Sequence, residues 1–527
     1  MMLVLFFLAT LFLTVNGASL DDPIVRLDYG QFQGKYSRPY DINYFRRIPY
    51  AAPPTGQGRF AAPQPPEKIN GTYDTDRDFP GCPQGADAGS EDCLYLGLYS
   101  KPWTNTTALR PVVVFLHGGG WIRGSASLKI PPQGFPTLNV SSLNDFIVVH
   151  PNFRVNVFGL LPGKRIKQCK DCALNPGLLD QELALKWVQQ NIAKFGGDPK
   201  QVTLWGQSSG GGGVVSQVLA QSSRKGKKLF QRAIMSSPYY PRTYRYDSAE
   251  AEKLYNDMVQ RTGCAGAGDT LHCLRTMNFR VIQQAAFNMT NEYQKSSASF
   301  TWGPVIDDSF LVENLSQVAS NNNLNIEHAW GIYNTREGQN FVPSGFKSTN
   351  GTVWNSTEAS LDHWIKTWMP KFNSTVSREL KTIYPELGEA ETFGFDTVYD
   401  RVALMYRDVF LSCPDLWVAK GANQSGYISE YTIAPAVHAS DVAYWNTINA
   451  RQQRSRGVYL SFVGGLASFI QTGNPNRNNE GITAPIPKVD ANQIWLIEED
   501  AGLHRTPIDP LVKRCEFWQK YGSLVPI

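Results

Sequence analysis

The stretch that most constrains the fold is residues 195–210, which contains a G-x-S-x-G pentapeptide. A short apolar run precedes the pentapeptide, as in a buried strand, and residues 211–217 can begin a helix. A strand, a sharp turn and a helix in this order would hold Ser208 in a tight backbone with its hydroxyl group exposed. We therefore predict that Ser208 is a nucleophile. Gly206 and Gly210 are expected to be required, because a side chain at either position would clash across the turn.

The sequence around this corner alternates between buried strands and helices. Residues 111–116 and 146–149 are continuous apolar runs, as expected of parallel strands that are buried on both faces. Residues 181–195 carry apolar side chains at helical spacing. This alternation, with short connections, indicates a large, mostly parallel, doubly wound α/β sheet. No low-complexity linker divides the chain, so we predict one domain over residues 19–527, with helical insertions.

Several other elements can be placed from local patterns. We predict a strand pair at residues 24–28 and 30–34, a Pro-rich surface loop at 46–66, strands at 91–99, 328–333 and 426–432, and a mainly helical region at 355–425.

The amino terminus indicates export. Residues 1–15 are an apolar run that is too short to span a bilayer comfortably, and we predict a cleaved signal peptide at residues 1–18. No later segment has the length and purity of a membrane helix, and the net charge of +4 includes no basic block that would indicate nucleic acid binding. We therefore predict a secreted, extracellular glycoprotein. Its nine N-x-Ser/Thr sequons are Asn70, Asn105, Asn139, Asn288, Asn314, Asn350, Asn355, Asn373 and Asn423.

The eight cysteines fit an extracellular location, because an even number in a secreted chain indicates disulfides. Cys82–Cys93 and Cys264–Cys273 are short-loop pairs, which leaves Cys413 and Cys515 as a long-range pair. Cys169 and Cys172 have C-x-x-C spacing. A zinc site would need two further soft ligands and a redox site would need a thioredoxin-like context, so we favour a local disulfide.

A serine nucleophile needs a base that takes its proton and an acid that orients the base. In a fold of this kind the acid and then the histidine follow the serine along the chain. Of the seven histidines, His438 best fits this order, because it follows a predicted strand and lies among small residues. Glu337 also follows a predicted strand and is the candidate acid, with Asp307 and Asp308 as alternatives.

A glycine-rich segment is the candidate for the hydrogen-bond donors that an oxyanion also requires. Residues 117–120, His-Gly-Gly-Gly, follow the predicted strand at 111–116. Bare glycine backbone lets N–H groups approach an oxyanion that develops on a substrate carbonyl.

With these motifs the sequence resembles the type-B carboxylesterases, the α/β-hydrolase family that includes cholinesterases and fungal lipases. Residues 195–210 fit the serine signature of that family, and residues 91–96 fit its second signature. Residues 334–338 and 437–438 match its acid and histidine segments. The resemblance covers nearly the whole chain after the predicted signal peptide.

The resemblance implies an α/β-hydrolase fold and hydrolysis of small-molecule carboxylic esters through an acyl-enzyme, with no metal or organic cofactor. It implies a catalytic triad of Ser208, Glu337 and His438. It implies oxyanion donors from the backbone N–H groups of Gly119, Gly120 and Ser209. It also implies the disulfides Cys82–Cys93, Cys264–Cys273 and Cys413–Cys515, whereas Cys169–Cys172 is outside the common pattern.

Two departures from the family pattern narrow the expected activity. Gln207 stands where glutamate is usual, which removes a negative charge beside the nucleophile. The loop between Cys82 and Cys93 holds ten residues and no Trp. In cholinesterases a longer loop carries a Trp that binds quaternary ammonium by a cation–π contact, and in fungal lipases a long loop forms the lid. The sequence therefore argues against choline esters and against strongly lid-controlled lipolysis.

Three alternatives remain open from the sequence. A lipase and an acyl transferase could use the same triad, since pocket shape would distinguish them. A non-catalytic adhesion or binding protein could use the same scaffold, but such relatives usually lack a triad residue, and all three are present. The sequence leaves the oligomeric state open.

Overall fold

The computed structural model describes residues 22–104, 106–126, 144–224, 226–297, 300–321, 323–342, 357–446, 450–500 and 504–527. The predicted signal peptide at residues 1–18 lies outside these ranges, as do the sequons at Asn105, Asn139, Asn350 and Asn355. Among the described helices, none has both the length and the apolar character that crossing a membrane requires.

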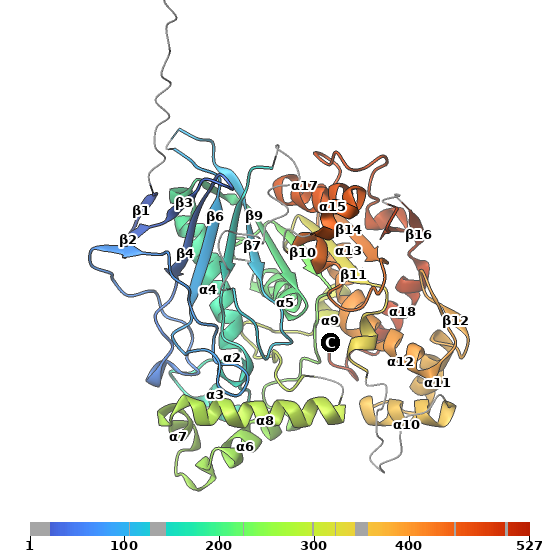
Figure 1. The fold of residues 1–527 in the computed structure, drawn as a ribbon. Coiled ribbons are helices and arrows are strands. Elements are labelled where there is room, and N and C mark those ends of the chain that lie inside the picture. Colours follow the sequence, from blue (N-terminus) through green and yellow to red (C-terminus); the bar gives the residue numbers. More distant parts are fainter. Residues whose placement is uncertain are drawn as a thin grey trace, which may run out of the picture.

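A central sheet of 11 strands organises the molecule, in the order β16-β15-β14-β11-β10-β9-β7-β8-β6-β4-β3. The strands from β15 to β8 in this order are parallel, and antiparallel strands complete both edges. Their bounds are β3 Lys35–Ser37, β4 Ile42–Pro49, β6 Tyr95–Ser100, β7 Arg110–Leu116, β8 Ile147–Pro151, β9 Gly197–Gln207, β10 Arg232–Ser236, β11 His328–Asn334, β14 Ser425–Tyr431, β15 Gln493–Ile497 and β16 Arg505–Pro507. Figure 1 shows the sheet passing from the blue amino-terminal strands to β16 in red.

Helices cover both faces of the sheet and flank its ends. Their bounds are α2 Asn156–Leu160, α3 Lys164–Gln168, α4 Pro176–Asn191, α5 Ser209–Arg224, α6 Ala249–Arg261, α7 Thr270–Thr276, α8 Phe279–Ser297, α9 Leu315–Ala319, α10 Glu358–Trp368, α11 Ser374–Ile383, α12 Val398–Arg407, α13 Cys413–Gly421, α14 Val442–Trp445, α15 Ala450–Arg454, α16 Arg456–Val458, α17 Gly464–Thr472 and α18 Asp509–Lys520. In Figure 1, α6, α7 and α8 lie together beneath the sheet.

Successive side chains of each central strand enter two different cores, because side chains alternate across a strand. In β7, Val112 and Val114 pack in the larger core with α4 and α5, whereas Val113 packs in the smaller core with α17. A strand with apolar neighbours on both faces must be apolar at every position, which explains the continuous runs in the sequence. The predicted α/β-hydrolase fold, a mostly parallel sheet between helices, is confirmed.

Two expectations near the amino terminus need correction. Residues 46–49 are not loop but the end of β4, because they pair with β6 after an irregularity between Phe45 and Ile48. The strand expected at residues 91–99 starts only at Tyr95. Glu91 instead forms a buried ion pair with Arg59, at 2.7 Å. The strand pair expected at the start of the chain is present as β1 Ile24–Leu27 and β2 Gly30–Gln33 in a small separate sheet with β5 Thr72–Asp74.

All cysteines are paired in the structure, which has no free thiol. The pairs are Cys82–Cys93, Cys169–Cys172, Cys264–Cys273 and Cys413–Cys515.

Candidate active site

Ser208 lies at the corner between β9 and α5, near the centre of the sheet. Its backbone has a φ of 56°, a left-handed conformation that a residue with a side chain rarely adopts. Backbone hydrogen bonds hold it there: its N–H donates to the Ser236 carbonyl at 2.9 Å, and its own carbonyl accepts from Gly212 and Tyr239. Strain of this kind persists only where surrounding structure imposes it, as in a turn that presents a nucleophile.

The two glycines of the pentapeptide allow this corner to form. A Cβ atom on Gly206 would lie 2.2 Å from the carbonyl oxygen of Gly210. A Cβ atom on Gly210 would lie 2.1 Å from the carbonyl oxygen of Leu116, on the neighbouring strand. Both separations are far below van der Waals contact, and the atoms involved belong to backbone that cannot rotate away. The sequence-based explanation of the two glycines is therefore confirmed.

Gly210→Ala is expected to destabilise the folded protein by about 3 kcal/mol or more, because the methyl group must displace the end of β7. Thermal or urea-induced unfolding measures the effect. The matched control is Gly268→Ala, where a Cβ atom would meet no atom within 4 Å. Equal stability of the two variants would show that the corner tolerates a side chain.

His438 approaches Ser208 from the loop that follows β14. Its Nε2 lies 2.8 Å from Ser208 Oγ, within hydrogen-bond distance. Its backbone N–H donates to Asn340 Oδ1 at 2.8 Å, and the Phe341 ring contacts the imidazole edge to face with 4.9 Å between ring centroids. The side chain of His438 is 12% exposed, so a small molecule can reach it.

Glu337 lies on the other side of the imidazole, just beyond the end of β11. Its Oε2 is 3.4 Å from His438 Nδ1. Its Oε1 accepts hydrogen bonds from the Ser237 hydroxyl, from the Asn334 N–H at 2.5 Å and from Asn334 Nδ2 at 2.8 Å. The side chain is completely buried. One carboxylate oxygen is thus fixed by three donors, and the other is left to face the histidine.

Ser237 and Asn334 are site residues that sequence reasoning did not find. Ser237 follows β10 directly, and Asn334 is the last residue of β11, so both lie at the carboxyl ends of central strands. That position was the available signal, because ligand and catalytic groups gather at this edge of parallel sheets. Asn334 Nδ2 also donates to Asp441 Oδ1, at 3.1 Å. Burial raises the pKa of Asp441 above its ordinary range.

The alternative acids have other partners. Asp307 Oδ1 accepts from three backbone N–H groups of the following turn, and its Oδ2 accepts from Asn175 Nδ2 at 2.7 Å. Asp308 forms an exposed ion pair with Arg245, at 2.7 Å. Neither forms a hydrogen bond with His438. The structure therefore brings Glu337, and neither aspartate, to the imidazole.

The His-Gly-Gly-Gly segment lies against the serine corner. A Cβ atom on Gly118 would lie 3.0 Å from Ser208 Cβ, and Gly119 and Gly120 have φ values of 125° and 65°. Within the described chain, the N–H groups of Gly119, Gly120 and Ser209 donate to no backbone carbonyl. His117 stacks on Phe153 with 4.2 Å between ring centroids, and burial lowers the pKa of its imidazole to about 4.

Two cavities adjoin this arrangement. One, of about 570 Å³, is lined by aromatic side chains including Tyr239, Phe300 and Phe410. Tyr239 lies next to the nucleophile candidate, because its backbone N–H donates a hydrogen bond to the Ser208 carbonyl at 2.8 Å. The other cavity, of about 200 Å³, lies between the glycine segment and α8 and also includes Phe300.

Comparison with known proteins identifies the family. A sequence model of the carboxylesterase family matches residues 21–518, which is nearly the whole chain. The chain belongs to the carboxylesterase family. The resemblance seen in the motifs is confirmed, and as a carboxylesterase the chain is a carboxylic ester hydrolase of the serine hydrolase type.

Individual relatives of this carboxylesterase support the assignment. It is 26% identical to carboxylesterase patB of Aspergillus clavatus over 96% of this chain and 97% of the relative. It is 35% identical to the secreted triacylglycerol lipase LIP1 of Gibberella zeae, but that match covers 51% of this chain and 50% of the lipase.

A solved structure extends the likeness to the fold. The crystal structure of EstA from Aspergillus niger superimposes with a TM-score of 0.81, over 96% of this chain and 99% of EstA. The two sequences are 24% identical, so this comparison bears on the fold alone.

Proposed function

We propose that this carboxylesterase is a secreted serine esterase in which Ser208, His438 and Glu337 form the catalytic triad. The observation that carries the proposal is the 2.8 Å separation between Ser208 Oγ and His438 Nε2, across 230 residues of sequence. A serine hydroxyl is a weak nucleophile on its own and needs an adjacent base that removes its proton.

In the first step, Ser208 Oγ attacks the ester carbonyl while its proton passes to His438 Nε2. A tetrahedral intermediate forms, and its C–O bond to the alcohol then breaks. The alcohol leaves with the proton that His438 returns, and the acyl group stays on Ser208 Oγ. In the second step, His438 takes a proton from water, the resulting hydroxide attacks the acyl-enzyme, and the acid departs as Ser208 regains its proton.

Glu337 orients the histidine in both steps. Because its Oε1 is occupied by three donors, Oε2 faces Nδ1 and favours the tautomer that carries the proton there. Nε2 is then free to accept the serine proton. The positive imidazolium that follows is attracted to the buried carboxylate, so the 3.4 Å separation is expected to shorten during the reaction.

Three backbone N–H groups are proposed to stabilise the oxyanion, those of Gly119, Gly120 and Ser209. Their lack of backbone acceptors within the described chain supports this role, because donors already engaged could not serve an incoming oxygen. Donors fixed in advance need no reorganisation when charge develops on the substrate. No step of the mechanism calls on a metal or an organic cofactor.

The proposed substrates are small-molecule esters without a quaternary ammonium group. The short, Trp-free loop closed by Cys82–Cys93 supports this, as does the neutral side chain of Gln207. Secretion is proposed from the apolar amino terminus and from the name of the related lipase LIP1, which describes that protein as secreted. Sequons with exposed asparagine residues fit a glycosylated surface; these are Asn70, Asn288, Asn373 and Asn423, while Asn314 is half-buried.

Labelling with a fluorophosphonate tests this proposal directly. The hydroxyl group of a base-activated serine displaces fluoride from the reagent and becomes phosphonylated, so modification should fall on Ser208 alone. Ester hydrolysis should fall in proportion to the fraction of enzyme labelled. Peptide mass spectrometry of the labelled protein locates the modified residue. Complete inhibition with the label on a different serine would exclude Ser208 as the nucleophile.

A further inference from the structure

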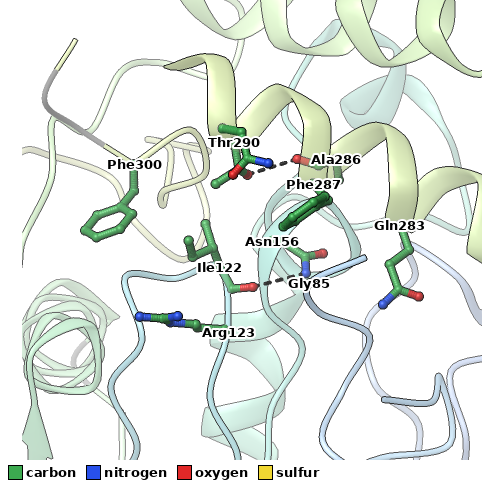
Figure 2. Close-up of a pocket in the computed structure, with 10 residues that line it drawn as sticks. Gly85, Ile122, Arg123, Asn156, Gln283, Ala286, Phe287, Thr290 and Phe300 are labelled. Carbon is green, nitrogen blue, oxygen red and sulfur yellow. Dashed lines mark hydrogen bonds between the residues drawn. The ribbon is translucent and has the colours of Figure 1, made fainter. Parts of the chain in front are cut away.

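The smaller of the two cavities lies beside the glycine segment, and Arg123 is the one charged residue in its described lining. It has a volume of about 200 Å³ and lies between the Cys82–Cys93 loop, the segment after the oxyanion glycines, and α8. Its described lining includes Arg123 and contains no aspartate or glutamate. In the view of Figure 2, Arg123 and Phe300 extend on the same side of Ile122.

Arg123 has no hydrogen-bond or ion-pair partner among the described residues, and its side chain is exposed. Other arginines near this face are engaged: Arg280 donates to Gln283 Oε1 at 2.9 Å and to the Gly89 carbonyl at 3.1 Å. Arg123 therefore presents five N–H donors and a positive charge to whatever enters the cavity.

The buried polar groups of the lining already have partners. Asn156 Nδ2 donates to the Pro83 carbonyl at 2.6 Å. Figure 2 shows its longer contact with the Ile122 carbonyl, at 3.4 Å, and the hydrogen bond from Thr290 Oγ1 to the Ala286 carbonyl, at 2.9 Å. Gln283 Nε2 donates to the carbonyls of Gln84 and Ala88. The cavity thus offers apolar surface and one unengaged cation, which is a combination suited to an organic anion.

Arg123 lies close to the glycines that are proposed to bind the oxyanion. The carbonyl oxygen of Arg123 would lie 2.1 Å from a Cβ atom on Gly119, and Arg123 Cγ would lie 3.1 Å from it. The Phe300 ring, which also lines the cavity, would lie 2.7 Å from a Cβ atom on Gly120. A molecule whose ester carbonyl occupies the oxyanion site could therefore reach the cavity with a neighbouring part.

The side chain beside the nucleophile has compatible chemistry. Gln207 Oε1 would lie 2.7 Å from a Cβ atom on Gly118, which places the amide beside the glycine segment. Gln207 Nε2 is buried and has no hydrogen-bond partner among the described residues. An amide N–H donor at this point does not repel an anion, whereas a carboxylate would.

We propose that Arg123 binds a carboxylate of the substrate, so that this enzyme prefers esters that carry a second, ionised carboxyl group. The proposal rests on the function proposed above for Ser208. The geometry suits a carboxylate because the planar guanidinium can donate two parallel hydrogen bonds to it. Such a carboxylate can belong to the alcohol part of the ester or to its acyl part.

Matched ester pairs test the proposal in the intact, disulfide-bonded enzyme. For a carboxylate in the alcohol part the pair is meta-acetoxybenzoate and meta-acetoxybenzamide, followed by phenol absorbance. For a carboxylate in the acyl part the pair is monoethyl adipate and ethyl adipamate, followed by acid release. Each pair differs in charge and hardly in shape, so the ratio of the two kcat/KM values reports charge recognition.

We expect a ratio of about fivefold to tenfold in favour of the anionic ester for at least one pair, a modest factor because Arg123 is exposed. Higher ionic strength should reduce the ratio by screening. Arg123→Gln should bring it close to one, mainly through a higher KM for the anionic ester, and Arg123→Glu should bring it below one. Lys420→Gln, which removes an exposed cation just before the amino end of β14, should keep the wild-type ratio.

A wild-type ratio near one for both pairs would overturn the proposal, as would an unchanged ratio in Arg123→Gln. In either case, hydrolysis of the neutral esters would still support the proposed esterase function. If the wild-type enzyme hydrolyses no member of either pair, the proposed function itself fails and this inference fails with it. The pair that shows the larger ratio identifies which part of the ester carries the carboxylate.

Discussion

Ser208→Ala is expected to lower kcat for short p-nitrophenyl esters by roughly 10⁵- to 10⁶-fold, because the acyl-enzyme can no longer form. The fold should persist, since the hydroxyl group donates no hydrogen bond to the backbone that shapes the corner; those bonds come from the main chain. Initial rates with purified protein, together with circular dichroism and the secreted yield, measure both outcomes.

The matched control for this substitution is Ser223→Ala, on α5, the helix that follows Ser208. Ser223 Oγ donates only within α5, to the Leu219 carbonyl at 3.0 Å and to the Ala220 carbonyl at 3.4 Å. Its removal should leave kcat within about twofold of the wild type, because Ser223 is exposed and most surface substitutions away from a site have small effects. Activity retained by Ser208→Ala would rule out the proposed mechanism.

Glu337→Gln should lower kcat by about 10⁴-fold, through the tautomer of His438 and not through loss of folding. Three donors surround Oε1, so the amide oxygen of the new side chain must take that place. Its NH₂ group then faces His438 Nδ1 and donates to it. The imidazole proton is forced onto Nε2, where it blocks acceptance of the Ser208 proton. Steady-state kinetics and the chemical shift of the imidazole nitrogen atoms both report this change.

Asp308→Asn is the comparison for this experiment. It also neutralises a carboxylate among the candidate acids, but one that forms an ion pair with Arg245 at the surface. Activity close to that of the wild type is expected. If Asp308→Asn proved to be the inactive variant and Glu337→Gln remained active, the assignment of the acid would be wrong.

The sequence predicted the serine corner, the parallel sheet and the candidate acid and base, and physical reasons explain why. The tight turn at Ser208 requires glycine at positions 206 and 210, which leaves a pattern that is recognisable in the local sequence. Glu337 and His438 follow strands that are recognisable as apolar runs, and parallel strands bring their carboxyl ends to one edge. Chain order and chain position were therefore sufficient to select three residues that the structure brings together.

The remaining parts of the site depend on contacts that no local pattern records. Ser237 and Asn334 are ordinary polar residues until the sheet places β10 beside β11, with Ser236 opposite Ile332. Arg123 is one of many charged residues in the sequence, and only the structure shows that it lacks a partner among the described residues beside the glycine segment. The end of β4 is predicted as loop from the sequence because its proline and two arginines conceal the pairing with β6.

β14 pairs in parallel with β11, with Tyr431 opposite Asn334. This pairing bears on the stage of folding at which the chain becomes active. A nascent or refolding polypeptide that has completed the sheet only as far as β11 already contains the serine, the acid and the glycine segment. On the proposed triad, such a polypeptide lacks its base until β14 pairs with β11 and the loop after β14 brings His438 to Ser208. The onset of ester hydrolysis during refolding would then report the docking of β14.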